Sequence, residues 1–546
     1  MTILAGRNAT ESGHVIVGHN EDAPGRFVMQ TYLNKSIHRG QNHKIKFEND
    51  LAELDLPEFR SKLFWSEART YDQNTSFCDL FLNGNGVVIC SNNCAYSKED
   101  KPELTGGIGY GLRYLTAEQA TSAKNAVEIA TGLIKKYGYA SSGRSYAFAD
   151  KHEIYILQVV HGKNFAVKKV PDDEICVIPN HFTIHEPDEF PELENLINYS
   201  KLRGWYSQSN NKFDFAQTFQ AEDSKNLDKN IYRQLRALEI INKNLEYDKF
   251  NLPFSVKPDK KINLDTIKKI LRTHFENTES FNNNGNPHFN KPLTVCNSDT
   301  LESSIIEIRH DVDLIAVRYA LGRPCNSVYV PLYFGINNLP EGYSDLNPDE
   351  ALKTHFKTPL YEMDARNNLW FKFMKFQACA DIFYPDKTDK IKSEIKRLEE
   401  KIERELKMLG NQINLRMKTD PDISRAMMEG SSNSWIASVK SWLEIMLKDL
   451  KITELENLTK IAPNKNFIVN IPGLDRDKIN LTETKCGPSF KNISEWSSCV
   501  NISDSELEFN SGEWTKNITK CLMDLYLKLV FKSGEVRAYC LNAYIK

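Results

Sequence analysis

The sequence predicts an α+β protein with two groups of strands and a helical second half. The first group begins at the amino terminus, where the apolar runs Thr2–Ala5 and Val15–Val17 flank a polar turn. A second group is expected over residues 303–333, and helical patterning takes over from 368. Of the 546 residues, 40% are hydrophobic, which is enough to build a core, so global disorder is excluded.

Strand signals continue from the first hairpin to about residue 179. A turn at Asn83–Gly86 precedes the apolar strand Val87–Cys90, which runs into several polar residues. Short polar turns then separate four strands of a predicted meander, at residues 145–149, 153–160, 165–170 and 175–179. The second group of strands is predicted at residues 303–309, 313–321 and 327–333.

Helical periodicity first appears over residues 115–137. Thr116 and Gln119 fit a capping box at the start of this helix, and Gly138 fits its end. Two further helices are predicted at residues 227–245 and 264–275. From 391 to 413, apolar residues recur three and four apart, as in a coiled coil, and Ala437–Leu450 is the predicted antiparallel partner. Such a stripe more often packs inside one chain than forms an oligomer seam, although a homo-oligomer remains possible.

These patterns divide the chain into three predicted parts. Residues 1–365 contain both groups of strands, 366–454 are helical, and 455–546 form an extension rich in Asn, Ser and Thr with short β-type runs. In this extension, Cys486 and Cys499 are spaced so that a disulfide between them could close a loop.

Composition excludes several classes of function. The net charge of −3 gives no electrostatic reason to expect nucleic acid as a partner. No apolar run approaches the ~20 residues of a membrane span, and no leader precedes the first strand, so we expect a cytoplasmic location for the chain as written. The eleven cysteines form no CxxC pair or zinc-type spacing, and the glycine-rich run Gly106–Gly111 follows no strand, so no metal or organic cofactor is expected. His181 and His185 lie in an apparently extended segment, where spacing by four does not favour a metal pair.

Polar residues at the ends of strands are the candidate site. The second strand ends in His19, Asn20, Glu21 and Asp22, so a carboxylate returns to the start of the chain. This arrangement is typical of hydrolases in which the first residue of the mature chain is the nucleophile and its α-amino group is the base. That amine has an ordinary pKa of about 7.7–8.0, which suits a base at neutral pH. On these residues alone, an ordinary amino-terminal hairpin is the more common explanation of the pattern.

Five blocks, in order, resemble a known family. They are TILAGRNAT…HVIVGHNED, LTGGIGYGLRYLTAEQATSAKNAVEIATGLIKKYG, SYAFADKHEIYILQVV, VPDDEICVIPNHFTI and SSIIEIRHDVDLIAVRYALGRPCNSVYVPLYFGI. Together they resemble the N-terminal-nucleophile dipeptidases, which include dipeptidase A of lactobacilli and the secernins, over roughly residues 2–450. The resemblance implies a four-layer αββα sandwich and hydrolysis of dipeptides through an acyl-enzyme on an amino-terminal cysteine.

The resemblance also implies roles for individual residues. Asp22 matches the acid that orients the nucleophile's amino group, Asn92 the oxyanion-hole amide, and Asn180 a second amide near the amino terminus. For Asn92 the other interpretation is a capping or turn asparagine at a strand end.

Two further positions complete the implied site. His19 matches a position often held by arginine in the more distant bile salt and penicillin amidases. Arg236, or alternatively Arg233, matches the arginine that completes the site. A carboxylate beside the amine and neutral amides at the oxyanion form a chemically coherent set.

The sequence departs from the family at the nucleophile. In the family register, the cysteine falls immediately before Met1, and no residue of this sequence occupies that place. One interpretation is that processing exposes an upstream cysteine, in which case a leader and export are possible. A second is that Thr2 is the nucleophile, although it lies two residues along the strand, a displacement of about 6.6 Å. A third is that the protein is a non-catalytic relative.

We therefore expect a cysteine-type dipeptidase acting on dipeptides or small amides. The alternatives are a catalytically inactive binding protein with the same fold, and a hydrolase of non-peptide acyl amides.

Overall fold

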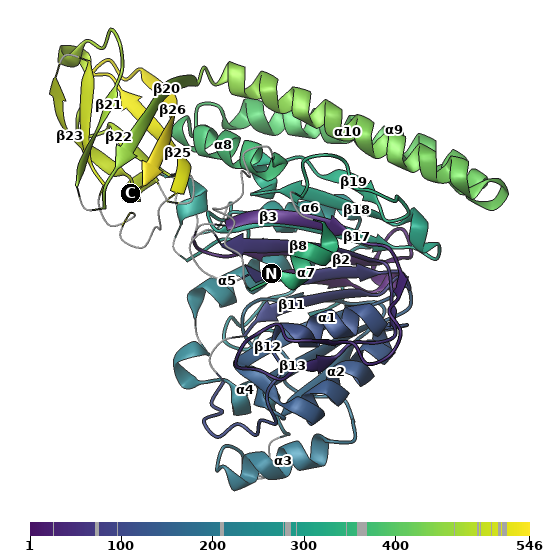
Figure 1. Ribbon diagram of the computed structural model, residues 1–546. Coiled ribbons are helices and arrows are strands. Elements are labelled where there is room, and N and C mark those ends of the chain that lie inside the picture. Colours follow the sequence, from purple (N-terminus) through teal and green to yellow (C-terminus); the bar gives the residue numbers. More distant parts are fainter. Residues whose placement is uncertain are drawn as a thin grey trace.

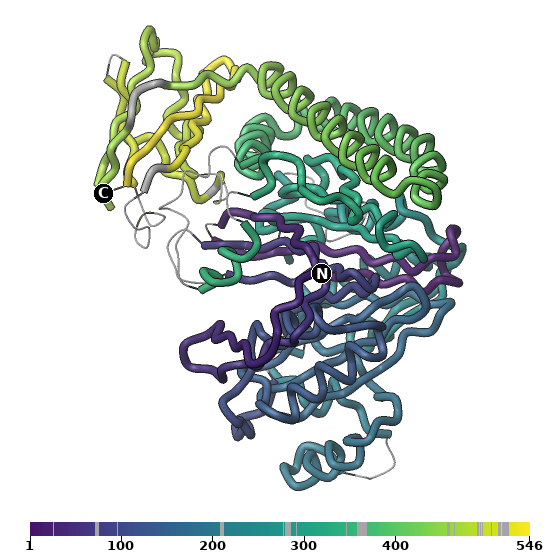
Figure 2. Tube along the Cα trace, turned by 45° about the vertical axis from the view of Figure 1, so that its right-hand side comes forward, coloured from purple at the N-terminus to yellow at the C-terminus, as the bar shows by residue number. Residues whose placement is uncertain are grey.

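Two large antiparallel sheets stacked face to face form the amino-terminal part of the molecule (Figure 1). The computed structural model describes residues 1–25, 27–70, 76–94, 97–207, 212–225, 227–276, 278, 285–290, 292–344, 347–356, 368–463, 465–488, 491, 493–503, 505–511, 515 and 521–545. The tube in Figure 2 shows the amino terminus at the middle of this stack.

The first sheet has β1 near its centre, and β1 is the strand that carries the amino terminus. Its neighbours are β15 on one side and β2 on the other. In spatial order the strands are β16 (Ser255–Val256), β15 (Ile175–Ile178), β1 (Thr2–Ala5), β2 (Val15–Asp22), β17 (Thr300–Ile308), β18 (Ala316–Leu321) and β19 (Val330–Tyr333). Both predicted groups of strands therefore meet in one sheet, through the pairing of β2 with β17.

The second sheet contains three strands of the predicted meander, whereas the fourth, predicted at 175–179, is β15 and pairs with β1 in the first sheet. In spatial order it consists of β14 (Phe165–Val170), β13 (Ile154–Gly162), β12 (Tyr139–Ala149), β11 (Val88–Asn93), β10 (Leu80–Asn83), β8 (Leu63–Thr70) and β3 (Phe27–Leu33), and β9 (Ser76–Phe77) also pairs with β8. Two small ribbons lie outside it, β4 (Ile37–His38) with β7 (Phe59–Arg60), and β5 (Lys44–Ile45) with β6 (Leu54–Asp55).

The alternation of side chains along each strand creates the layers. On β1, Leu4 packs into the core between the two sheets, whereas Ile3 packs against helices on the outer face. Helices α5 (Asp228–Ile241) and α6 (Leu264–Arg272) cover the first sheet, and α1 (Tyr110–Gln119) and α2 (Ala123–Tyr137) cover the second. The architecture is a four-layer αββα sandwich, as expected.

The single helix predicted at residues 115–137 is wrong, because two helices occupy that stretch. Ser122 caps α2 by accepting a hydrogen bond from the Asn125 amide, and the chain is extended at Ala120. Thr116 lies inside α1, where its hydroxyl donates to the Leu112 carbonyl, so it does not form the predicted capping box. Gly138 does end α2, in the positive-φ conformation (φ 76°) that favours glycine.

A long helical hairpin lies over the edge of the sandwich (Figure 1). It consists of α9 (Thr388–Thr419) and α10 (Pro421–Asp449), and α10 packs against β19. The predicted partner at residues 437–450 is only the second half of α10, which begins at Pro421 with Asp420 as its cap. The apolar stripe of α9 is buried within this chain. The remaining helices are α3 (Leu193–Leu202), α4 (Phe215–Phe219), α7 (Pro348–Lys353) and α8 (Leu369–Ile382).

The carboxy-terminal segment forms a third sheet with its own core. Its strands, in spatial order, are β20 (Thr453–Ile461), β26 (Val536–Ile545), β25 (Cys521–Val530), β22 (Lys485–Pro488), β23 (Ser497–Ser503), β24 (Glu506–Asn510) and β21 (Asn466–Asn470). Cys486 and Cys499 are buried free thiols, so the disulfide that their spacing would allow is not formed. The predicted boundary at residues 365 and 366 lies outside the described residues, and the one at 455 falls inside β20.

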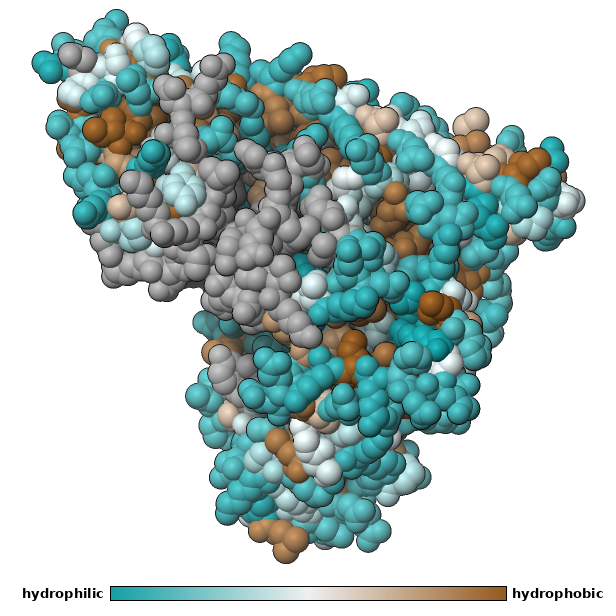
Figure 3. Space-filling model, viewed as in Figure 1, coloured by the Kyte–Doolittle hydropathy of each residue, from teal (hydrophilic) through white to brown (hydrophobic). Residues whose placement is uncertain are grey.

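The visible surface is predominantly hydrophilic, with apolar residues scattered over it (Figure 3). Among the described residues, no helix has both the length and the apolar character needed to cross a membrane.

Candidate active site at the amino terminus

The amino terminus is buried inside the sandwich. The Met1 amine donates a hydrogen bond to the Asn20 carbonyl (2.8 Å), and the Asn20 amide donates to the Met1 carbonyl (2.9 Å), so the ladder between β1 and β2 extends to the first residue. Burial lowers the pKa of the Met1 amine, and the nearby Asp22 carboxylate opposes this shift. Asn20 is held in turn by its own side chain, which donates to the Leu271 and Val295 carbonyls.

Thr2 points into the space between the two sheets and links them. Its hydroxyl donates to Oδ1 of Asn92 on β11 (2.6 Å) and lies 2.9 Å from Nδ1 of His19 on β2. Because the hydroxyl proton is given to Asn92, His19 must be the donor in the second bond. Burial lowers the pKa of His19 to about 3, so the ring is neutral.

Asp22 lies at the end of β2 in a separate polar cluster. Its Oδ1 accepts a hydrogen bond from the Thr300 hydroxyl (2.6 Å), and its Oδ2 lies 3.3 Å from Nη1 of Arg233. Nη2 of the same guanidinium donates to Oδ1 of Asn180 (2.7 Å). The Asn180 amide donates to the Asn93 carbonyl (2.8 Å), which connects this cluster to the end of β11. The structure thus places Asp22, Asn180 and Arg233 together.

Arg236 does not join this cluster. Its guanidinium pairs with Glu239 (3.2 Å) and donates to the Glu276 carbonyl (2.9 Å). Of the two arginines weighed from the sequence, Arg233 therefore contacts Asp22. Arg233 is buried on the helix face that also holds Asn230, which donates to the Asn180 carbonyl. The polar residues Asn230 and Arg233, three apart on a predicted helix, were the sequence signal for a polar helix face at this site.

A buried charged network that no sequence pattern indicated surrounds Asp79, whose charge acts on the Met1 amine and on His19. Asp79 accepts hydrogen bonds from Arg113, Arg144 (2.8 Å) and Ser91. Burial opposes ionisation of Asp79, but the two guanidinium groups prevail and hold its pKa at about 2. No local motif marks these residues, since they come from three strands or loops and one helix.

Two further acids face this network from the first sheet. Glu21 on β2 and Glu302 on β17 are directly opposite each other, and Oε2 of Glu21 lies 3.6 Å from Nε2 of His19. Burial, with the Asp79 charge, raises the pKa of Glu21. Burial also raises the pKa of Glu302 to about 7, although the Ser66 hydroxyl donates to it.

Replacing Glu302 by glutamine is expected to change how stability depends on pH. In the unfolded chain Glu302 ionises near 4.5, whereas in the folded chain it ionises near 7. Between these values the folded state binds the additional proton, so stability falls as the pH rises from 4.5 to 7, by about 3 kcal/mol at 1.36 kcal/mol per unit. Glu302→Gln should lack this loss.

Urea unfolding at pH 5 and pH 8 measures the effect. The exposed Glu58→Gln variant serves as control and should follow the wild-type pH dependence. If Glu302→Gln loses as much stability as wild type between these pH values, Glu302 does not carry the raised pKa.

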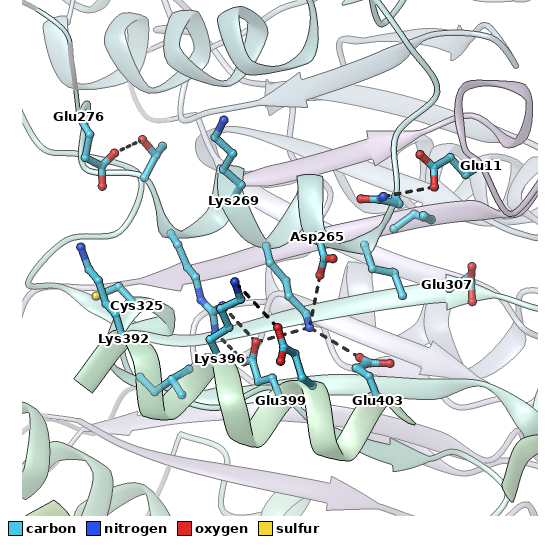
Figure 4. A pocket seen from close by; sticks show the side chains of 18 of the residues that line it. Glu11, Asp265, Lys269, Glu276, Glu307, Cys325, Lys392, Lys396, Glu399 and Glu403 are labelled. Carbon is cyan, nitrogen blue, oxygen red and sulfur yellow. Dashed lines mark hydrogen bonds and ion pairs between the residues drawn. The ribbon is translucent and has the colours of Figure 1, made fainter. Parts of the chain in front are cut away.

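A pocket of about 1080 Å³ lies on the other side of the first sheet, between α6 and α9 (Figure 4). Charged residues of both signs line it, including Lys269, Lys396, Glu399 and Glu403. None of the residues placed around the amino terminus above lines this pocket, so it is separate from the Asp22 cluster.

Comparison with known proteins identifies the family of the chain. Residues 1–361 match the model of peptidase family C69. This chain belongs to peptidase family C69. The match ends before the helical hairpin, so that hairpin lies outside the family model although the five-block resemblance was expected to reach about residue 450.

Curated relatives of this C69 chain are named as dipeptidases. Probable dipeptidase B of Lactococcus lactis is 25% identical over 366 residues, which cover 63% of this chain and 76% of the relative. Probable dipeptidase A of Streptococcus pyogenes is 24% identical over 375 residues, with 63% and 76% covered. Among solved structures, penicillin V acylase from Agrobacterium tumefaciens is 13% identical, with 62% of this chain and 87% of the acylase covered and a TM-score of 0.32.

Proposed function

We propose that this C69 peptidase is a dipeptidase that uses an amino-terminal cysteine at the position immediately before Met1. The observation that carries the proposal is that β1 pairs with a strand on each side, so the position of a preceding residue follows from two registers. Thr2 pairs with His19 on β2 and with Ile178 on β15. Extending both antiparallel registers by two residues predicts that a residue before Met1 would face Glu21 on one side and Asn180 on the other.

The side-chain direction supports the same position. Side chains alternate along a strand, so the preceding residue would point, like Thr2, toward the inter-sheet face that holds His19 and Asn92. Its backbone amine would lie one residue beyond the Met1 amine, near the polar cluster of Asp22 and Arg233. A nucleophile, a base and two amide side chains would then be close together.

The chemistry follows the general order of acyl transfer. The cysteine thiol gives its proton to its own α-amino group, and the thiolate attacks the substrate carbonyl carbon. The Asn92 amide stabilises the negative oxygen of the tetrahedral intermediate without adding a charge. The C–N bond breaks as the amine returns the proton to the leaving amino group, and water then hydrolyses the thioester.

Other buried side chains would position the nucleophile and its amine. Asp22, held by Thr300 and Arg233, orients the α-amine, and Asn180 is fixed by Arg233 so that its amide remains at the end of β15. Thr2 is less suited to be the nucleophile, because its hydroxyl is fully buried and already donates to Asn92. The names of the relatives suggest dipeptides as the substrate class.

The test is the amino-terminal sequence and intact mass of the protein isolated from its native cell, followed by assay with a panel of dipeptides and acyl amides. We expect a mature chain that begins with Cys ahead of Met1 and hydrolyses dipeptides, and a Cys→Ala variant that does not. A mature chain that begins at Met1 contradicts the cysteine mechanism. Cleavage of acyl amides but not dipeptides would contradict the proposed substrate.

A further inference from the structure

Four buried side chains capable of binding a metal meet behind the first sheet. They are His274, His288, Cys296 and Cys325, and one ligand atom from each lies within 4.8 Å of all the others. All four are buried, and both cysteines are free thiols. We propose that these four residues form a tetrahedral Zn²⁺ site that stabilises the connection between α6 and β17.

The four residues come from separate parts of the chain. His274 follows the end of α6, His288 lies in a short turn of helix at Pro287–Phe289, and Cys296 precedes β17. Cys325 comes from the helical turn Pro324–Asn326, between β18 and β19. No short zinc motif links them, which is why the sequence did not predict the site.

The ligand types select the ion. Two thiolates and two imidazoles around one point form a Cys2His2 set, which favours zinc over the harder ions magnesium and calcium. In a regular tetrahedron with Zn–N and Zn–S bonds of about 2.0–2.3 Å, ligand atoms lie about 3.3–3.8 Å apart. The ligand atoms of the observed cluster lie up to 4.8 Å apart, with one pair at 2.9 Å, so shifts of about 1 Å or less bring them to this geometry. Two thiolates also neutralise the charge of the ion, so a buried site carries no net charge.

Each histidine has a carboxylate on the opposite side of its ring. Nδ1 of His274 forms a hydrogen bond with Oε1 of Glu276 (3.1 Å), and Nδ1 of His288 lies 3.3 Å from Oδ1 of Asp381 on α8 without hydrogen-bond geometry. Zinc-bound histidines commonly donate their second ring proton to such a group, which orients the ring and makes it a better ligand. Asp381 is itself held by Arg323 (2.7 Å).

The inner nitrogens face the cluster. Nε2 of His288 lies 2.9 Å from Sγ of Cys325. Nε2 of His274 is buried and has no hydrogen-bond partner among the described residues, which is unusual for a buried polar atom. A bound zinc ion would satisfy it.

The cluster also has a path to solvent. His274 and Cys325 line the pocket between α6 and α9, in which Cys325 and Glu276 are visible near the wall (Figure 4). An ion can therefore reach the ligands without unfolding of the sheet. The pocket would thus serve as the entry path that a buried metal site needs.

The ion would hold a segment that supports the Asp22 cluster. The connection between α6 and β17 supplies the Val295 carbonyl that accepts from Asn20, and it runs into Thr300, which donates to Asp22. Zinc bound to Cys296 would fix this segment against the helical turn that carries Cys325. Loss of the ion is expected to lower the melting temperature.

The first experiment measures metal in the full-length protein purified without chelators. We expect about one zinc per chain and, by X-ray absorption at the zinc edge, two sulfur ligands at about 2.3 Å and two nitrogen ligands at about 2.0–2.1 Å. Metal-stripped protein should regain zinc and melting temperature when zinc alone is added. These measurements use the unmodified chain and do not depend on hydrolysis, so they remain informative whether or not the protein cleaves dipeptides.

The second experiment compares cysteine variants. The double substitution Cys296→Ser and Cys325→Ser should reduce bound zinc at least tenfold, whereas Cys540→Ser, which changes a buried cysteine of the carboxy-terminal sheet, should retain it. The proposal is overturned if stripped wild-type protein binds no zinc, if its zinc has no sulfur ligands, or if the double variant retains zinc. A Cys296–Cys325 disulfide in the native protein, detected by mass after alkylation, would also overturn it.

Discussion

Replacing Arg233 by alanine is expected to reduce kcat/KM for dipeptide hydrolysis by about 100-fold or more, because displacement of a catalytic group by 1 Å costs about that much. Arg233 contacts Asp22 and Asn180 at once, so both lose their shared partner. The change also leaves the Asp22 carboxylate without its cation in a largely buried place, and breaking such a pair costs about 3–5 kcal/mol. Arg233 acts as a positioning residue in this proposal.

The neighbouring Arg236 is the matched control. It lies on the same helix but pairs with Glu239, so Arg236→Ala should retain near-wild-type activity and stability. Steady-state kinetics at a temperature where both variants are folded, with urea unfolding for stability, separates the two effects. We expect Arg233→Ala to lower kcat more than it raises KM. Equal losses in both variants would show that the cluster with Asp22 has no special role.

Replacing Asn92 by alanine is expected to reduce kcat by about 100- to 1,000-fold, the usual cost of removing one oxyanion-hole donor. Such a donor acts mainly in the transition state, so KM should change little. The substitution also leaves the fully buried Thr2 hydroxyl without its acceptor on Asn92, which should cost about 1–3 kcal/mol of stability, so kinetics are measured where the variant is folded.

Asn93 provides the control for this prediction. Its side chain is exposed, and its contact with Asn180 uses only the backbone carbonyl, so Asn93→Ala keeps that bond. Kinetics of both variants with one dipeptide substrate gives the comparison. A fall in kcat for Asn92→Ala of less than tenfold, with the fold intact by circular dichroism, would remove Asn92 from the proposed oxyanion hole.

Much of the fold could be predicted from local pattern. The strands of the amino-terminal hairpin and the meander were placed within a few residues, because alternating or continuous apolar runs between turn residues have few other structures available. The predicted strand 165–170 matches β14 in full, whereas the stretch 115–137, predicted as one helix, contains parts of the two helices α1 and α2. The break at Ala120–Ser122 carries no glycine or proline, so only the capping by Ser122 marks it.

The candidate site was predicted in part. Asp22 and Asn92 lie at strand ends, Asn180 lies two residues beyond β15, and His19 lies within β2 opposite Thr2. The choice between Arg233 and Arg236 required the structure, because residues three apart lie only about 60° apart around a helix, so spacing alone does not say which of the two contacts Asp22.

The sequence by itself determined the family, the strand and helix content and the residues at the start of the site, since these depend on local order along the chain. Only the tertiary structure decided which distant groups meet. The acids Glu21 and Glu302, the network around Asp79 and the set of His274, His288, Cys296 and Cys325 all join segments far apart in sequence. Their contacts follow from strand register and the close packing of layers, which fix side chains in space without leaving a periodic or motif-like trace in the sequence.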